Sequence, residues 1–105
     1  MTNKWGIPKE VEDLVLSRDK SCVYCNVTFS KDDKLRKRKQ SWEHIINDIR
    51  INGANNIALC CMSCNASKGA KVLEIWLESK YCKSKEITRD TVAMVVKEAM
   101  KNRQN

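Results

Sequence analysis

Apolar residues near the start of the chain recur at the spacing of an α-helix. Val11, Leu14 and Val15 stand at positions i, i+3 and i+4, which puts them on one face of a helix. Pro8 precedes them, and its fixed φ angle suits the first helical turn. The pattern predicts a short amphipathic helix over residues 8–18.

A second apolar stripe lies near the carboxyl end of the chain. Its members share one helix face and are Val92, Val95, Val96, Ala99 and Met100. Thr88 is a suitable N-cap, and basic residues gather at the C-terminal end, where cations interact favourably with the helix dipole. We expect a helix over residues 88–103 that closes the core.

Between these two segments the apolar residues form shorter runs. Residues 42–46 and residues 57–60 have the composition of short strands, and the polar loop between them contains Asn52-Gly53, a typical turn pair. A helical pattern follows over about residues 66–79. The residues on its expected face are Val72, Ile75, Trp76 and Ser79. The sequence therefore predicts the order strand, strand, helix between the two flanking helices.

The chain of 105 residues fits one α+β domain, residues 1–105, because it has apolar material for a single core. No apolar stretch approaches the roughly 18 residues of a membrane span. Residues 1–5 lack the apolar segment of a signal peptide. We therefore expect a cytoplasmic protein with no membrane partner.

Four of the six cysteines form two Cys-x-x-Cys pairs, Cys22, Cys25, Cys61 and Cys64. Four sulfurs in two short bites are the ligand set of a tetrahedral structural zinc site. A redox-active pair and disulfides are the alternatives. Redox chemistry uses one such pair after a βαβ pattern, and disulfides are rare in a reducing compartment, so zinc is the favoured interpretation.

The other two cysteines, Cys60 and Cys82, are expected to be small buried apolar residues. Cys60 abuts the second pair and competes with Cys61 as a ligand, but only Cys61 is separated from Cys64 by two residues. The long gap between the two pairs contains the only histidine of the chain, His44. We therefore expect the segment between the two cysteine pairs to carry a functional site.

The formal net charge is +7, so a polyanion gains most from the field around this protein. Residues 30–41 hold almost no apolar side chain and include the basic run from Lys34 to Lys39. We expect an exposed basic loop there, either a solvated face or a clamp on a phosphate backbone.

The segment around the histidine carries a specific pattern. Residues 42–46 read Trp-Glu-His-Ile-Ile, Gly53 follows, and residues 56–69 read Asn-Ile-Ala-Leu-Cys-Cys-Met-Ser-Cys-Asn-Ala-Ser-Lys-Gly. With the first cysteine pair, this pattern over residues 22–69 resembles the HNH endonucleases. The resemblance implies a zinc-stapled ββα-metal core that hydrolyses phosphodiester bonds.

The resemblance implies a role for each matching residue. His44 matches the general base, and a neutral imidazole is suited to take a proton from the attacking water. Glu43, where the family more often has Asp, and Asn65 match the oxygen ligands of a catalytic Mg²⁺ or Mn²⁺ ion. Because neighbouring residues of a strand point to opposite faces, the strand should bend or end at Glu43 and His44.

Two further positions match the family pattern. Asn56 matches the middle Asn, which braces the intervening loop, although an Asn at a loop end also caps turns. Lys68 matches a lysine that contacts phosphate, although a solvated lysine fits equally well. The residues expected to contact nucleic acid are therefore Lys68 and the three loop residues Lys37, Arg38 and Lys39.

The sequence thus favours an endonuclease with structural zinc that acts on double-stranded DNA. One active site cuts one strand, so double-strand cleavage requires a homodimer, repeated nicking or a partner. The alternative is a non-catalytic zinc-ribbon module that binds nucleic acid. Such a module has no use for Glu43, His44 and Asn65 in one register.

Overall fold

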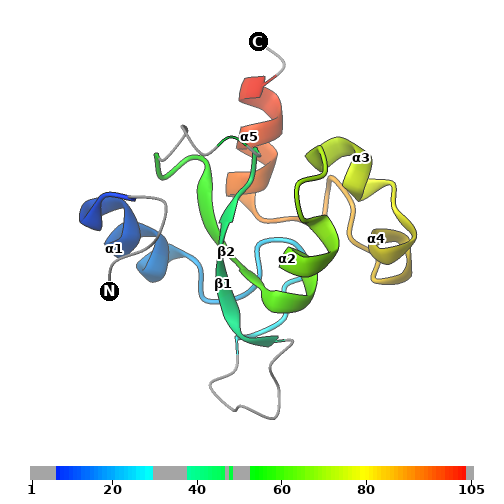
Figure 1. The fold of residues 1–105 in the computed structure, drawn as a ribbon, viewed down its shortest axis with the longest axis horizontal. Coiled ribbons are helices and arrows are strands. Elements are labelled where there is room, and N and C mark those ends of the chain that lie inside the picture. The colour runs from blue at the N-terminus through cyan, green and yellow to red at the C-terminus, as the bar shows by residue number, and fades with distance from the viewer. Residues whose placement is uncertain (1–6, 30–37, 47, 49–52, 104–105) are drawn as a thin grey trace.

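Two antiparallel strands lie at the centre of the structure, with helices on both sides of them (Figure 1). The structure is a computed structural model that describes residues 7–29, 38–46, 48 and 53–103. Its elements are α1 (Lys9–Arg18), β1 (Gln40–His44), β2 (Ile57–Cys61), α2 (Met62–Lys68), α3 (Leu73–Leu77), α4 (Lys80–Ser84) and α5 (Met94–Arg103). The architecture is α+β, as the sequence predicts.

The two strands pair from Gln40 opposite Cys61 to His44 opposite Ile57. β1 lies two residues earlier than predicted and ends at His44, the position where the sequence requires a bend or an end. Asn52 lies outside the described residues, but the turn is evident at Gly53, whose carbonyl accepts hydrogen bonds from the N–H groups of Asn56 and Ile57. β2 therefore starts directly from a tight turn.

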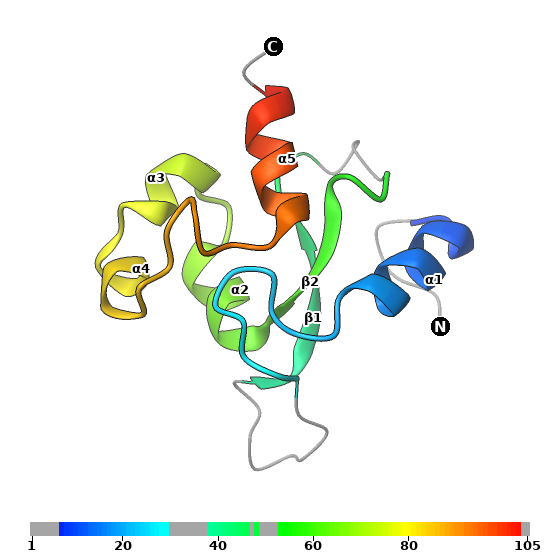
Figure 2. The ribbon, with the colours of Figure 1, turned by 180° about the vertical axis from the view of Figure 1, so that it is seen from behind.

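The two faces of β2 pack against different parts of the chain because side chains alternate along a strand. Ile57 and Leu59 pack with Val15 of α1 and with Ile7. Ala58 and Cys60 belong to the larger cluster of buried residues on the other side. Figure 2 shows the same division from behind, with α1 on one side of the strands and α2, α3 and α4 on the other.

The junction after α1 is fixed by a pair of oppositely charged neighbours. Arg18 contacts both oxygens of the buried Asp19 carboxylate, at 2.7 and 2.8 Å, and also donates to the carbonyls of Ala54 and Ile57. Asp19 Oδ2 in turn accepts the backbone N–H of Leu59 at 3.0 Å. The ionic pair therefore attaches α1 to the edge of β2 and to the turn before it.

The prediction of one helix over residues 66–79 is wrong, because α2 ends at Lys68 and α3 covers only Leu73–Leu77. Gly69 ends α2 with a φ of +50°, a conformation that L side chains rarely adopt. The buried face of α3 consists of Leu73, Trp76 and Leu77, whereas Ile75 is exposed. In the part of the chain that the structure describes, no helix combines the length and the apolar character needed to cross a membrane.

The final helix starts six residues later than predicted. Thr88 does not cap it, because its hydroxyl accepts the N–H groups of Asp90 and Thr91 in a separate turn. The segment before α5 is instead attached to the first cysteine pair, since Ala93 N–H donates to the Val23 carbonyl at 2.8 Å. The predicted apolar stripe is confirmed where it lies on α5, with Val96 fully buried.

Replacement of Asp19 by Ala is expected to lower the free energy of unfolding by about 1–3 kcal/mol, because the Leu59 N–H is then left buried without its partner. Chemical denaturation of the metal-loaded protein measures this change. Asp13→Ala is the matched control. Asp13 forms an exposed i,i+4 pair with Lys9 at 3.0 Å, so its loss should leave the free energy of unfolding nearly unchanged. Equal effects of the two changes would contradict the proposed role of Asp19.

Candidate metal centre and the buried ionic cluster beside it

Four cysteine sulfurs meet at one point of the structure. The Sγ atoms of Cys22, Cys25, Cys61 and Cys64 all lie within 4.8 Å of one another. The Sγ atoms of Cys25 and Cys61 are 3.7 Å apart. Zinc–sulfur bonds of about 2.3 Å in a tetrahedron require sulfurs about 3.8 Å apart, so this group could hold a metal ion such as zinc.

Each half of the centre is formed by a local structure. The first half is a tight turn in which Asn26 has a φ of 66° and its N–H donates to the Cys22 carbonyl. The second half is the junction of β2 and α2, where Cys61 is the N-cap and its sulfur accepts the Cys64 N–H at 3.4 Å. Val23 N–H donates to the Leu59 carbonyl, which joins the two halves through the sheet.

The sulfurs lie among hydrogen-bond donors that suit thiolates. Cys22 Sγ accepts the N–H groups of Tyr24 and Cys25 at 3.4 and 3.5 Å. The Tyr81 hydroxyl donates to Cys64 Sγ at 3.3 Å. Hydrogen bonds with the Cys22 thiol lower the pKa of Cys61 to about 7 and hold the pKa of Cys25 well below its usual range, whereas hydrogen bonds with neighbouring thiols raise the pKa of Cys22 and of Cys64. Metal binding requires all four as thiolates, so the ion would displace the protons that the four sulfurs share.

The two remaining cysteines are separate from this group. Cys60 and Cys82 are completely buried. Burial raises the pKa of the Cys60 thiol and likewise that of Cys82, so both stay protonated and behave as small apolar residues. This confirms the prediction for both residues and removes Cys60 as a competitor of Cys61.

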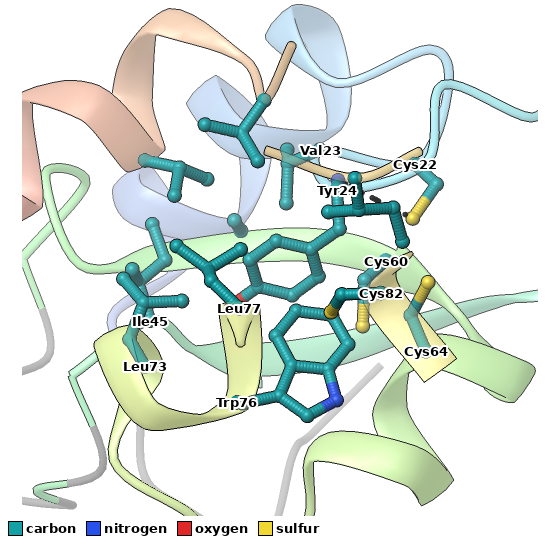
Figure 3. Close-up of a cluster of buried hydrophobic side chains, with 14 of the residues drawn as sticks. Cys22, Val23, Tyr24, Ile45, Cys60, Cys64, Leu73, Trp76, Leu77 and Cys82 are labelled. Atoms are coloured by element: carbon teal, nitrogen blue, oxygen red, sulfur yellow. Dashed lines mark hydrogen bonds between the residues drawn. The ribbon is translucent and has the colours of Figure 1, made fainter. Parts of the chain in front are cut away.

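An ionic cluster lies on the same side of the sheet as the cysteines. Glu43 Oε2 accepts a hydrogen bond from the Tyr24 hydroxyl at 2.7 Å and is 3.0 Å from Lys68 Nζ. Tyr24 is the third residue of the first Cys-x-x-Cys motif, and its ring packs edge-on against that of Trp76, with 4.9 Å between the ring centroids (Figure 3). Burial raises the pKa of Tyr24 well above its usual range, so its hydroxyl is a neutral donor.

Lys68 is buried completely rather than exposed to a ligand phosphate. Its ammonium group bridges the Glu43 carboxylate and the carbonyl of His44, which it contacts at 3.3 Å. The expectation that Lys68 contacts nucleic acid is therefore not met. A buried lysine requires a charged partner, and Glu43 is that partner.

The other predicted residues lie around the same junction. Asn65, on α2, donates from Nδ2 to the carbonyl of Trp42, the residue before Glu43, at 3.1 Å. His44 is buried at the end of β1. Asn56 accepts the N–H of Ile46 at 2.7 Å and donates to its carbonyl at 3.1 Å, which is the geometry of a loop brace.

The basic loop is described only in part. Lys37 lies outside the described residues, Arg38 is exposed and Lys39 is half-buried. The Lys39 carbonyl accepts the N–H of Met62 at 3.0 Å, so the loop enters β1 close to the start of α2.

Sequence reasoning missed Tyr24 and Tyr81, which contact the predicted site residues. A tyrosine inside or near a cysteine pair is compatible with simple packing, and the partner of its hydroxyl depends on tertiary structure.

Comparison of the chain with protein-family models, curated proteins and solved structures found no match.

We predict one zinc ion per chain and a strong loss of folding when Cys25 is changed to Ser, because the small core does not hold the two halves together alone. Elemental analysis and far-UV circular dichroism measure both quantities. Cys82→Ala is the control and should keep one zinc ion, since Cys82 is buried outside the group of four. A folded, metal-free wild-type protein would contradict the prediction.

Proposed function

We propose that the chain is a metal-dependent endonuclease of the HNH type that hydrolyses DNA phosphodiester bonds, with a structural zinc ion at the four cysteines. The hydrogen bond from Asn65 to the Trp42 carbonyl supports this most directly. It joins α2 to Trp42, the residue of β1 directly before Glu43. The bond therefore supports a site at the junction of β1, which carries the acid and the histidine, with α2, which carries the amide.

In this proposal His44 is the general base. Its imidazole accepts a proton from the water that attacks phosphorus. His44 is the last residue of β1 and is still paired with Ile57, so the chain can turn away directly after it. Asn56 acts as a positioning residue that holds Ile46 and hence the chain that follows the histidine.

Glu43 and Asn65 would hold the catalytic Mg²⁺ or Mn²⁺ ion through oxygen atoms. Tyr24 and Lys68 both contact Oε2 of Glu43, so Oε1 is the oxygen proposed for the ion. Asn65 donates from Nδ2 to Trp42, and its Oδ1 is the second proposed ligand. When bound, the ion would neutralise charge on the phosphate and on the leaving oxygen.

A non-catalytic zinc module that binds nucleic acid is the second candidate. It is favoured by the pairing of Glu43 with Lys68, which satisfies the carboxylate inside the protein without a catalytic ion. The net charge of +7 suits both candidates equally. Cleavage is the property that separates them.

The zinc-loaded protein is expected to nick supercoiled plasmid DNA in the presence of Mg²⁺ or Mn²⁺. Brief treatment with EDTA should abolish cleavage while the far-UV spectrum is retained, because thiolates hold zinc more tightly than two oxygens hold a hard cation. Fresh Mg²⁺ should then restore activity. Gel electrophoresis separates nicked from linear product.

His44→Ala tests the general base in the same assay. It should keep zinc and DNA binding and lose about 10²- to 10⁴-fold in cleavage rate. Lys71→Ala, which changes an exposed lysine just after α2, should cleave at the wild-type rate. Cleavage by His44→Ala at the wild-type rate would rule out the mechanism. Absence of cleavage by the wild type with every divalent ion would favour the non-catalytic module.

The combined change of Lys37, Arg38 and Lys39 to Ala is expected to weaken DNA binding and to flatten its dependence on salt. Each phosphate contact that is lost should reduce the slope of log K against log salt by about 0.9. Fluorescence anisotropy with a labelled duplex measures the slope.

The control for this change removes three lysines elsewhere, Lys80, Lys83 and Lys85 of the α4 region, which are exposed. It alters the net charge by the same amount. An equal reduction of the slope by both triple variants would show that net charge, and not the loop, determines binding.

A further inference from the structure

The carboxylate proposed as a metal ligand already has a positive partner. Lys68 Nζ is 3.0 Å from Glu43 Oε2, and the two side chains are 1% and 9% exposed. The ammonium also donates to the His44 carbonyl at 3.3 Å, so it is fixed at two points. Water cannot screen this pair as it screens a surface pair, and each charge depends on the other.

Tyr24 strengthens the same arrangement. Its hydroxyl donates to Oε2, the oxygen that also faces Lys68. Two donors on one oxygen hold the carboxylate in a single orientation. Tyr24 is itself held by the metal centre, because it lies between Cys22 and Cys25 and its N–H donates to Cys22 Sγ.

This charge balance affects any divalent ion that reaches the site. Glu43 and Lys68 together carry no net charge, and the Asn65 amide is neutral. A divalent cation that enters meets a resident ammonium group close to its one anionic ligand. Attraction to the site is therefore weak until another anion is present.

We propose that Lys68 is the resident counter-ion of Glu43 and makes divalent-metal binding at Glu43 and Asn65 depend on an incoming nucleic-acid phosphate. This inference rests on the proposed nuclease function. The phosphate oxygen supplies the negative charge that Lys68 has neutralised in the free protein. Metal and DNA then bind with positive coupling, and the coupling must be reciprocal.

A titration with Mn²⁺ tests the inference without cleavage. The protein is the 105-residue, zinc-loaded His44→Ala variant, and electron paramagnetic resonance measures free Mn²⁺ with and without a short DNA duplex. We expect the duplex to tighten Mn²⁺ binding by about 5- to 150-fold, the usual range of coupling between two sites. Duplex alone is titrated in parallel, and its own Mn²⁺ binding is subtracted.

Lys68→Met, made in the same background, removes the counter-ion while keeping a long apolar stem. It should bind Mn²⁺ more tightly in the absence of DNA, and the coupling should fall towards one. Lys71→Met is the matched control, because Lys71 is exposed and its ammonium contacts only the Ser67 carbonyl among the contacts that the structure describes. Lys68→Arg should restore the coupling. Zinc content and far-UV spectra establish that each variant is folded.

The outcomes separate this inference from the proposed function. Equal Mn²⁺ affinity with and without DNA would overturn the inference, even if Lys68→Met does not fold, and plasmid cleavage by the wild type would still support the nuclease. Unchanged coupling in a folded Lys68→Met variant would overturn it as well. Absence of Mn²⁺ binding in every condition, together with absence of cleavage, would overturn both.

Discussion

The fold depends on the meeting of two cysteine pairs that are far apart in the chain. Cys25 and Cys61 are 36 positions apart, yet their sulfurs are within 3.7 Å. Closure of such a long loop costs entropy, and a core of this size offsets it only in part. A metal ion bound by four thiolates would contribute its binding free energy directly to folding. Both strands lie inside the closed loop, so the sheet depends on the same contact.

The ionic cluster is attached to this centre from two directions. Tyr24 reaches Glu43 from inside the first cysteine pair, and α2 runs from Cys61 and Cys64 to Lys68. The position of Glu43 is therefore fixed by elements that the four cysteines hold together. A structural change at the metal centre would therefore move the Glu43 carboxylate through Tyr24 and through α2, although none of the four cysteines contacts it directly in the part of the chain that the structure describes.

The sequence predicts those parts of the molecule that depend on local pattern. Cysteine spacing indicated the four-sulfur group, and periodicity indicated α1 and the buried stripe of α5. Prediction from the sequence failed where contacts between distant parts of the chain determine the structure. Gly69 divides a continuous helical pattern, and Thr88 forms its own turn. The burial of Lys68 could not be predicted either, because a lysine is expected to be solvated unless it is known to have a carboxylate partner such as Glu43.

Trp76 lies where both tyrosines of the metal centre meet. Its indole is 4.9 Å from the Tyr24 ring and 6.0 Å from the Tyr81 ring, measured between centroids. Tyr24 lies between two of the cysteines, and the Tyr81 hydroxyl contacts the sulfur of a third, Cys64. A movement of Cys22, Cys25 or Cys64 would therefore shift a tyrosine ring against the indole. Of the three tryptophans in the chain, Trp76 is therefore the one whose fluorescence we expect to respond to a change at the cysteine centre.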